Sequence, residues 1–180
     1  MALTGGQGGI ITDSQFGAAR IKNINVSNLH HLLESGIIPV VCGFQGVTED
    51  NHKFTTLGRG GSDTTAAALG AALHAEFVEI YTDVDGIMTA DPRVVEKATI
   101  LQQISYAEVC QMAHNGAKVI HPRAVEIAMS SNVPLIVKST FSEAPGTLIT
   151  NERSAGALGS DVAISDNMAS GVASLSDIAQ

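Results

Sequence analysis

Large aromatic side chains, basic residues and long apolar runs are all scarce in this chain. Its 180 residues include no Trp, and Phe and Tyr make up only 4%, so few side chains are suited to stacking on nucleic acid bases. The formal net charge of −8 repels a phosphate backbone. No apolar run approaches the length of a membrane span, and no signal-peptide pattern opens the sequence. We therefore expect no nucleic acid partner, no membrane segment and a cytoplasmic location.

Clusters of metal-binding residues are also absent from the sequence. Cys42 and Cys110 are far apart and form no CxxC or Cys/His pattern, so we expect two free thiols rather than a disulfide framework or a zinc site. His30 and His31 are adjacent, but no second group of ligands follows them at a spacing typical of metal sites. The sequence therefore predicts no metal centre built by the protein.

The residues that are plentiful indicate a layered fold. Hydrophobic residues make up 44% of the chain, enough for one domain with a real core. Helical and strand-like patterns alternate, which is typical of an α/β protein. Helices are expected near Leu29–Leu33 and over residues 62–74, 106–115 and 124–131. Strands are expected over residues 37–41, 77–82 and 134–138, with a hairpin between 43 and 57.

Residues 55–66 form a glycine-rich turn that leads into an alanine-rich helix. The glycines let the backbone approach a ligand closely, and the guanidinium of Arg59 is suited to gripping a carboxylate or phosphate. Ser62 or Asp63 is expected to cap the helix, whose N-terminal N–H groups would then face the loop. The pattern favours an anion site, although an ordinary strand-to-helix turn would explain the glycines alone equally well.

Two further stretches, residues 81–93 and 116–124, make the pattern more specific. Together with the glycine-rich turn, and in this order, they resemble the aspartate kinases of the amino acid kinase family, over residues 3 to 150. The resemblance implies a three-layer αβα sandwich of the carbamate kinase-like type. It also implies that ATP, carrying Mg²⁺, phosphorylates the side-chain carboxylate of L-aspartate, the first step toward lysine, threonine and methionine.

The resemblance assigns roles to individual residues on the substrate side. It implies that Arg59 contacts the α-carboxylate of aspartate, and that Asp63 orders the catalytic lysines by ion pairing. Lys118 matches the lysine that reaches the transferring phosphate and the nucleotide. The remaining substrate-binding positions are Gly60, Gly61 and Ser62.

A second set of residues is implied to contact the nucleotide. These residues are Thr82, Asp83 and Arg93, at the end of an expected strand and in the acidic loop that follows it. Met88 stands where the family usually has an aromatic residue near the adenine or ribose. This departure weakens any expectation of base stacking there.

The sequence also departs from the family in lacking a K-F-G-G phosphate-gripping motif, since Lys53-Phe54 is followed by two threonines. We therefore expect residues 1–150 to be a catalytic domain incomplete at its N-terminus, and residues 151–180 to be a linker and the start of a truncated ACT regulatory domain. Such a chain should bind nucleotide weakly and transfer little phosphate unless Lys22 or Lys53 substitutes for the missing lysine. It should also self-associate or bind a complementary kinase segment.

Two other functions stay open at this point. One is a different amino acid kinase, acting on acetylglutamate or a nucleoside monophosphate, although the G-R-G-G-S-D run favours aspartate. The other is a non-catalytic fragment or subunit that binds nucleotide, which the missing motif favours.

Overall fold

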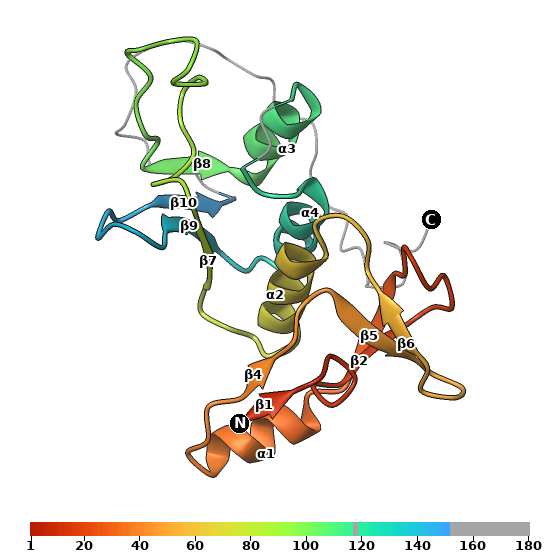
Figure 1. Cartoon of the computed structure of the whole chain (residues 1–180). Coiled ribbons are helices and arrows are strands. Elements are labelled where there is room, and N and C mark those ends of the chain that lie inside the picture. Colours follow the sequence, from red (N-terminus) through yellow and green to blue (C-terminus); the bar gives the residue numbers. More distant parts are fainter. Residues whose placement is uncertain (117–118, 152–180) are drawn as a thin grey trace.

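The computed structural model describes residues 1–116 and 119–151, which form an α/β structure (Figure 1). The helices are α1 (Ser27–Glu34), α2 (Gly61–Ala72), α3 (Tyr106–His114) and α4 (Pro122–Ser130). The strands in the first half are β1 (Ala2–Leu3), β2 (Ile10–Thr12), β3 (Ile21–Ile24), β4 (Val40–Val41), β5 (Gln45–Thr48) and β6 (Phe54–Thr56). Those in the second half are β7 (Val78–Thr82), β8 (Gln103–Ser105), β9 (Leu135–Ser139) and β10 (Thr147–Thr150).

The second half of the chain builds a four-stranded sheet in the order β7-β9-β10-β8. β9 runs parallel to β7 and antiparallel to β10, and β10 runs parallel to β8. Leu135 and Val137 are fully buried, whereas Ile136 and Lys138, which alternate with them, are half-buried, because alternate residues of a strand face opposite sides. Helices α2, α3 and α4 lie side by side on the face that carries the buried residues (Figure 1).

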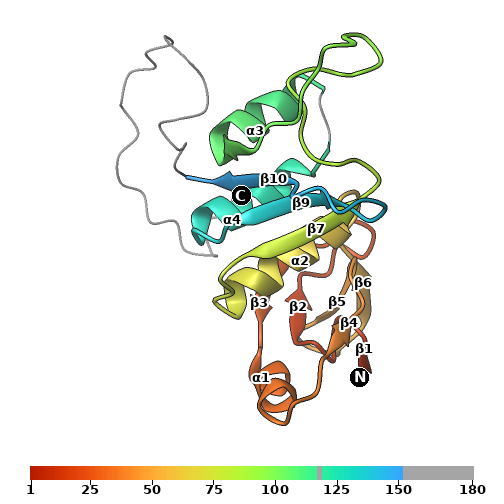
Figure 2. The same ribbon diagram turned by 90° about the vertical axis from the view of Figure 1, so that its left-hand side faces the viewer.

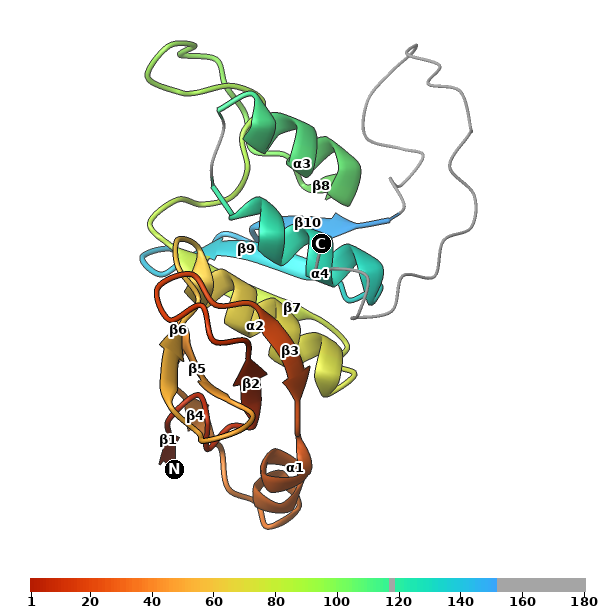
Figure 3. The same cartoon turned by 90° about the vertical axis from the view of Figure 1, so that its right-hand side faces the viewer.

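The first half of the chain forms a second four-stranded sheet, in the order β3-β2-β5-β6, and a separate parallel pair, β1-β4. Helix α2 lies between this second sheet and β7 (Figures 2 and 3). Ile21 and Ile24 of β3 pack against the main core from the far side of α2. A smaller cluster joins Leu29 and Leu32 of α1 to Leu3 of β1. The alanine-rich sequence of α2 suits this position, since small side chains let two layers approach one helix.

The α/β class predicted from the sequence is confirmed, and most predicted elements are present with shifted ends. The predicted strand over 37–41 is reduced to Val40–Val41, and the hairpin of β5 and β6 is confirmed as an antiparallel pair. Helix α4 begins at Pro122 rather than at residue 124, because proline fits the first helical turn, where no N–H donor is needed.

The prediction that Ser62 or Asp63 caps α2 is wrong. The helix begins at Gly61, and its N-cap is Gly60, with φ 72° and no side-chain capping hydrogen bond. Glycine takes this left-handed conformation without the steric cost that a side chain would add. Asp63 therefore lies within the first turn of the helix and is available for another contact.

No helix in the described ranges is both long and apolar enough to cross a bilayer.

Candidate functional site

The glycine-rich turn is packed against the N-terminus of α4. Asp63 of α2 accepts a hydrogen bond from the backbone N–H of His121, with 3.2 Å between Oδ2 and N. His121 is the N-cap of α4, and its Nδ1 accepts a hydrogen bond from the backbone N–H of Arg123 at 3.3 Å. A Cβ atom added to Gly60 would overlap the His121 ring. The N-termini of two helices are thus held together by one carboxylate and one close contact.

A pocket of about 510 Å³ opens at this junction. Arg59, Gly60 and Asp63 contribute from the turn and α2, and His121 and Pro122 from the start of α4. The positive dipole ends of α2 and α4 therefore both lie at the pocket, together with the exposed guanidinium of Arg59. This arrangement suits a small anion, with Asp63 as the one carboxylate among the residues that line it. Its other lining residues are Ala113, His114, Gly116, Val119 and Ile120.

The loop after β7 is anchored by Thr147 of β10, which is completely buried. The Thr147 hydroxyl accepts a hydrogen bond from the N–H of Ile87 at 2.8 Å and donates one to the carbonyl oxygen of Leu101 at 2.6 Å. Backbone hydrogen bonds also join Ile87 to Leu101 and Thr89 to Thr99, so the two arms of the loop run side by side. A loop that the sequence presents as an acidic turn is therefore fixed to the sheet at its base.

A second pocket, of about 520 Å³, lies between this loop and α3. Val109 and Met112 of α3 and Ile87 of the loop give it apolar walls, and Asp91 and Arg93 are its charged lining residues. Its other lining residues are Val84, Gly86, Met88, Thr89, Ala90, Pro92, Gly116, Val119 and Ile120. An apolar slot with a cation among its lining residues has the chemistry that a nucleotide base and its phosphates require.

Arg93 is positioned by a carboxylate two residues earlier in the loop. Its Nε donates to Asp91 Oδ1 at 3.0 Å and its Nη2 to Asp91 Oδ2 at 2.7 Å, a two-pronged pair. The side-chain hydrogen bond from Arg93 lowers the pKa of Asp91 to about 2, and the same contact raises the pKa of Arg93. The Arg93 side chain is 88% exposed, so its remaining N–H groups are open to a ligand.

The two pockets are neighbours. Gly116, Val119 and Ile120 line both of them. Gly116 and Val119 flank the two residues of the α3–α4 connection that are not described, one of which is the predicted catalytic Lys118. The structure thus brings Arg59, Gly60 and Asp63 to one pocket and Arg93 to the adjoining one. The role of Lys118 stays a prediction, because that residue lies outside the described residues.

The other predicted site residues do not line either pocket. Gly61 is buried, and a Cβ there would collide with Phe44, which gives this glycine a packing role. Ser62 is exposed on the first turn of α2. Thr82 ends β7 and donates its hydroxyl hydrogen to Asp83 Oδ1 at 3.2 Å, immediately before the loop of the second pocket.

His121 and Thr147 were not among the site residues predicted from the sequence. The signal for His121 was its place directly before a proline that can open a helix, which marks it as a candidate N-cap. Thr147 gave no such signal, because its contacts reach residues 60 and 46 positions away in the chain. No group of three or more His, Cys, Asp and Glu side chains able to hold a metal occurs in the ranges that the structure describes.

The chain matches the model of the amino acid kinase family over residues 2–139. It is 50% identical to aspartokinase 1 of Bacillus subtilis over 99% of its own length and 43% of that protein. It is 51% identical to the aspartokinase of Geobacillus stearothermophilus, over 84% of its own length and 37% of that protein. The chain therefore spans less than half the length of these curated relatives.

A solved structure shows the same likeness in three dimensions. Aspartokinase III of E. coli, in complex with aspartate and ADP, superimposes with a TM-score of 0.73 at 37% identity, over 86% of this chain and 35% of that one. The aspartate kinase of Synechocystis gives a TM-score of 0.70 at 44% identity, over 87% of this chain and 25% of that one. These likenesses confirm the fold expected from the sequence, and the chain belongs to the amino acid kinase family.

Proposed function

We propose that this protein is an aspartate kinase, which transfers the γ-phosphoryl group of ATP to the side-chain carboxylate of L-aspartate. The observation that carries the proposal is the pair of adjoining pockets, one lined by Arg59 and two helix N-termini and the other by apolar walls and Arg93. The relatives named aspartokinase, and the solved relative in complex with aspartate and ADP, support this choice of substrates.

The residues of the first pocket have complementary tasks in this proposal. Arg59 binds the α-carboxylate of aspartate and so orients its side chain toward the second pocket. Asp63 holds the N-terminus of α4 in place through the backbone N–H of His121, so that both helix dipoles face the same anion. The carboxylate of aspartate attacks the γ-phosphorus directly while ADP leaves, and no covalent bond to the protein is needed.

The second pocket holds the nucleotide in this proposal. Ile87, Val109 and Met112 enclose the base, and Arg93 reaches the phosphates. Lys118 supplies positive charge to the transferring group, and Mg²⁺ arrives with ATP on the phosphate oxygens. Thr82 and Asp83 precede this loop and support its start. Neither Gly61 nor Ser62 is needed for direct contact with the substrate, although both belong to the turn that shapes the aspartate site.

We further propose that residues 1–150 are catalytic domain, which the family match over 2–139 supports. The expected linker and ACT segment at 151–180 lies, except for Asn151, outside the described residues. A cytoplasmic location and self-association or pairing with a complementary kinase segment are part of the proposal. The free thiols of Cys42 and Cys110 are compatible with a reducing compartment.

The test compares phosphoryl acceptors for a complete aspartate kinase that carries this sequence, because the chain alone is expected to transfer little phosphate. ADP release would be measured with L-aspartate, N-acetyl-L-glutamate or UMP, and binding of each acceptor would be followed in parallel by calorimetry. The proposal predicts that aspartate gives the highest rate and the tightest binding, and that Arg59→Gln weakens aspartate binding. Preference for either of the other acceptors would contradict it, as would aspartate binding that Arg59→Gln leaves unchanged.

A further inference from the structure

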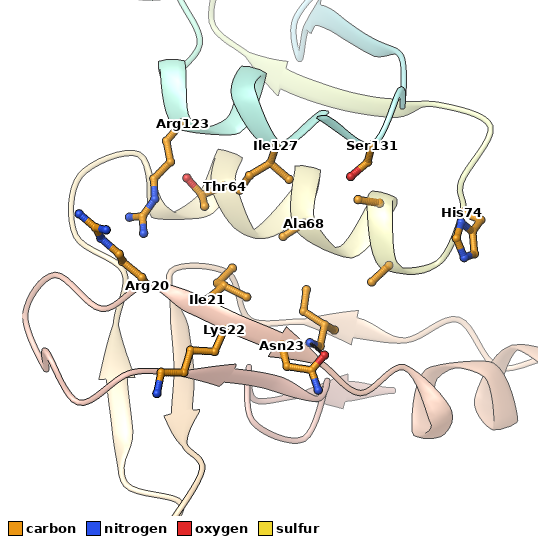
Figure 4. A pocket seen from close by; sticks show the side chains of 13 residues that line it. Arg20, Ile21, Lys22, Asn23, Thr64, Ala68, His74, Arg123, Ile127 and Ser131 are labelled. Carbon is orange, nitrogen blue, oxygen red and sulfur yellow. Dashed lines mark hydrogen bonds between the residues drawn. The ribbon is translucent and has the colours of Figure 1, made fainter. Parts of the chain in front are cut away.

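A third pocket, of about 450 Å³, lies on the opposite side of α2 from the sheet β7-β9-β10-β8 (Figure 4). It opens between β3 and the helices α2 and α4, and none of the residues assigned above to aspartate or nucleotide lines it. Its middle is apolar, with contributions from Ile21, Ile24, Ala68, Ala71 and Ile127. Its charged lining residues are Arg20, Lys22 and Arg123.

Two guanidinium groups lie at one end of this pocket. Arg20 directly precedes β3 and Arg123 lies in the first turn of α4, and their side chains extend to the same end of the pocket in the view of Figure 4. Burial, and then the positive charge of Arg20, lower the pKa of Arg123. Arg123 is half-buried and Arg20 is exposed, and like charges repel each other, so this arrangement costs free energy unless an anion compensates it.

Within the described residues, no carboxylate pairs with either group. The two ion pairs found there join Arg93 to Asp91 and Lys138 to Glu79. Asp13 and Glu126 attract Arg123 from a distance, and Asp13 Oδ1 already accepts the backbone N–H groups of Gln15 and Arg20. The positive charge at this end of the pocket is therefore not matched by an ion-pair partner within 4 Å.

Arg123 is also held in position before any ligand binds. Its Nη1 donates a long hydrogen bond of 3.4 Å to the carbonyl oxygen of Leu57, and its side chain lines the pocket. The hydroxyl of Thr64, beside it in Figure 4, donates to the carbonyl of Gly60 at 2.8 Å and so does not compete as a donor. A fixed guanidinium opposite an exposed one forms a clamp that matches the planar oxygens of a carboxylate or the face of a phosphate.

We propose that this pocket binds a small organic anion, whose carboxylate or phosphate group lies between Arg20 and Arg123 and whose aliphatic part lies against Ile21 and Ala68. The site is separate from the two pockets of the proposed kinase reaction and would be occupied independently of them. Its ligand class is set by the clamp at one end and the apolar wall beyond it.

The test is calorimetric titration of the purified chain with two probes, inorganic phosphate and hexanoate, at low ionic strength. We expect saturable binding of at least one probe, weakened on the order of tenfold by Arg20→Gln, because a charge-assisted contact of this kind is lost. Binding of phosphate alone would assign the site to phosphates, and binding of hexanoate alone to aliphatic carboxylates.

Two matched variants separate the clamp from general charge effects. Lys22→Gln removes one positive charge from the same pocket, but the Lys22 amine points away from the two guanidinium groups, so binding should persist (Figure 4). Arg59→Gln removes the cation of the separate pocket at the glycine-rich turn, which also suits a small anion, so it should weaken only binding at that second site and leave the Arg20-dependent binding unchanged. Arg20 is exposed, so its replacement should leave the fold intact, which circular dichroism would check. The proposal would be overturned if neither probe bound, or if Arg20→Gln and Lys22→Gln weakened probe binding equally. It would also be overturned if only Arg59→Gln weakened probe binding.

Discussion

Gly60 occupies a position that no residue with a side chain fills without displacing His121. Its φ of 72° adds a second constraint, because the left-handed region costs other residues about 1–2 kcal/mol. Both constraints apply at the proposed aspartate pocket, which Gly60 lines. The glycine is therefore required by the geometry of the site as well as by the turn.

We predict that Gly60→Ala lowers the free energy of unfolding by about 3 kcal/mol, combining backbone strain with the overlap against His121. Gly36→Ala is the matched control, since Gly36 has φ 73° and a Cβ there meets nothing within 4 Å. It should cost about 1 kcal/mol from backbone strain alone. Urea denaturation of both variants measures the difference. Equal losses of unfolding free energy would show that the overlap with His121 adds no cost.

Arg59 and Lys118 should have separable effects on the proposed reaction. Arg59→Ala should raise the Michaelis constant for aspartate more than that for ATP, because it removes a binding contact to the amino acid. Lys118→Ala should mainly lower turnover, by about a hundredfold or about 3 kcal/mol, because its charge is required in the transition state. Steady-state kinetics in an aspartate kinase carrying this sequence tests both, and equal effects of both variants on both substrates would show that the roles are wrong.

Asp91 should titrate unusually low as long as Arg93 is present. Its folded pKa of about 2 lies below the ordinary 3.8, so the contribution of this pair to stability is present above pH 3.8 and is lost as the pH falls toward 2. NMR of the side-chain carboxyl carbon measures this titration directly. In Arg93→Gln the pKa should return toward 3.8, and an unchanged low value would mean that Arg93 is not its cause.

At the scale of elements, α3 is fixed at its start and along its buried face. Ser105 and Glu108 form a capping box, in which the Ser105 hydroxyl accepts the Glu108 N–H and the Glu108 carboxylate accepts the Ser105 N–H. Tyr106, only 1% exposed, donates its hydroxyl hydrogen to the carbonyl oxygen of Val133 at 2.7 Å. These contacts place Val109 and Met112 as a wall of the proposed nucleotide pocket.

Tyr106→Phe should lower the free energy of unfolding by about 1–2 kcal/mol, since the buried carbonyl of Val133 loses this donor. Tyr81→Phe is the control, because the exposed Tyr81 hydroxyl donates to Glu79 at the surface and its loss should be close to neutral. Chemical denaturation compares the two. Equal effects would contradict the assignment of Tyr106 as an anchor of α3.

The same hydroxyl predicts a pH dependence at the alkaline end. Burial raises the pKa of Tyr106 from 10.0 to about 12, so its contribution to stability is complete below pH 10 and is lost as the pH rises toward 12. The wild-type chain should therefore lose more stability than Tyr106→Phe over this interval. Thermal melting at a series of pH values measures the difference, and parallel curves would argue against a buried phenol.

Sequence patterns predicted the longer elements better than the short ones. Helix α3 follows from apolar residues at 3-to-4 spacing, and its observed bounds, Tyr106–His114, differ by one residue from the predicted 106–115. Strands β3 and β8 were not predicted, because three or four residues give too few repeats to show alternation. The start of α2 was misplaced because a side-chain N-cap was expected, whereas the N-cap is Gly60 in the left-handed conformation.

At the scale of the whole molecule, the structure joins segments that are distant in sequence. The glycine-rich turn and the α4 N-terminus meet through Asp63 and His121, 58 residues apart, at the first pocket. Motif resemblance placed Arg59, Asp63 and Arg93 near a ligand, but it gave no account of which backbone contacts hold them. The Arg20–Arg123 clamp was also invisible in the sequence, because its two halves lie on separate elements that only packing brings together.

The two adjoining pockets and their separate ligands can be tested by mapping amide chemical shifts during titration with L-aspartate and, separately, with MgADP. Aspartate should shift the amides of Arg59, Gly60 and His121. MgADP should shift those of residues 86–93 and Met112, and both ligands should shift Gly116, Val119 and Ile120. Shifts from both ligands in one pocket only, or shifts from either ligand confined to the pocket of Arg20 and Arg123, would show that the two pockets do not hold these ligands.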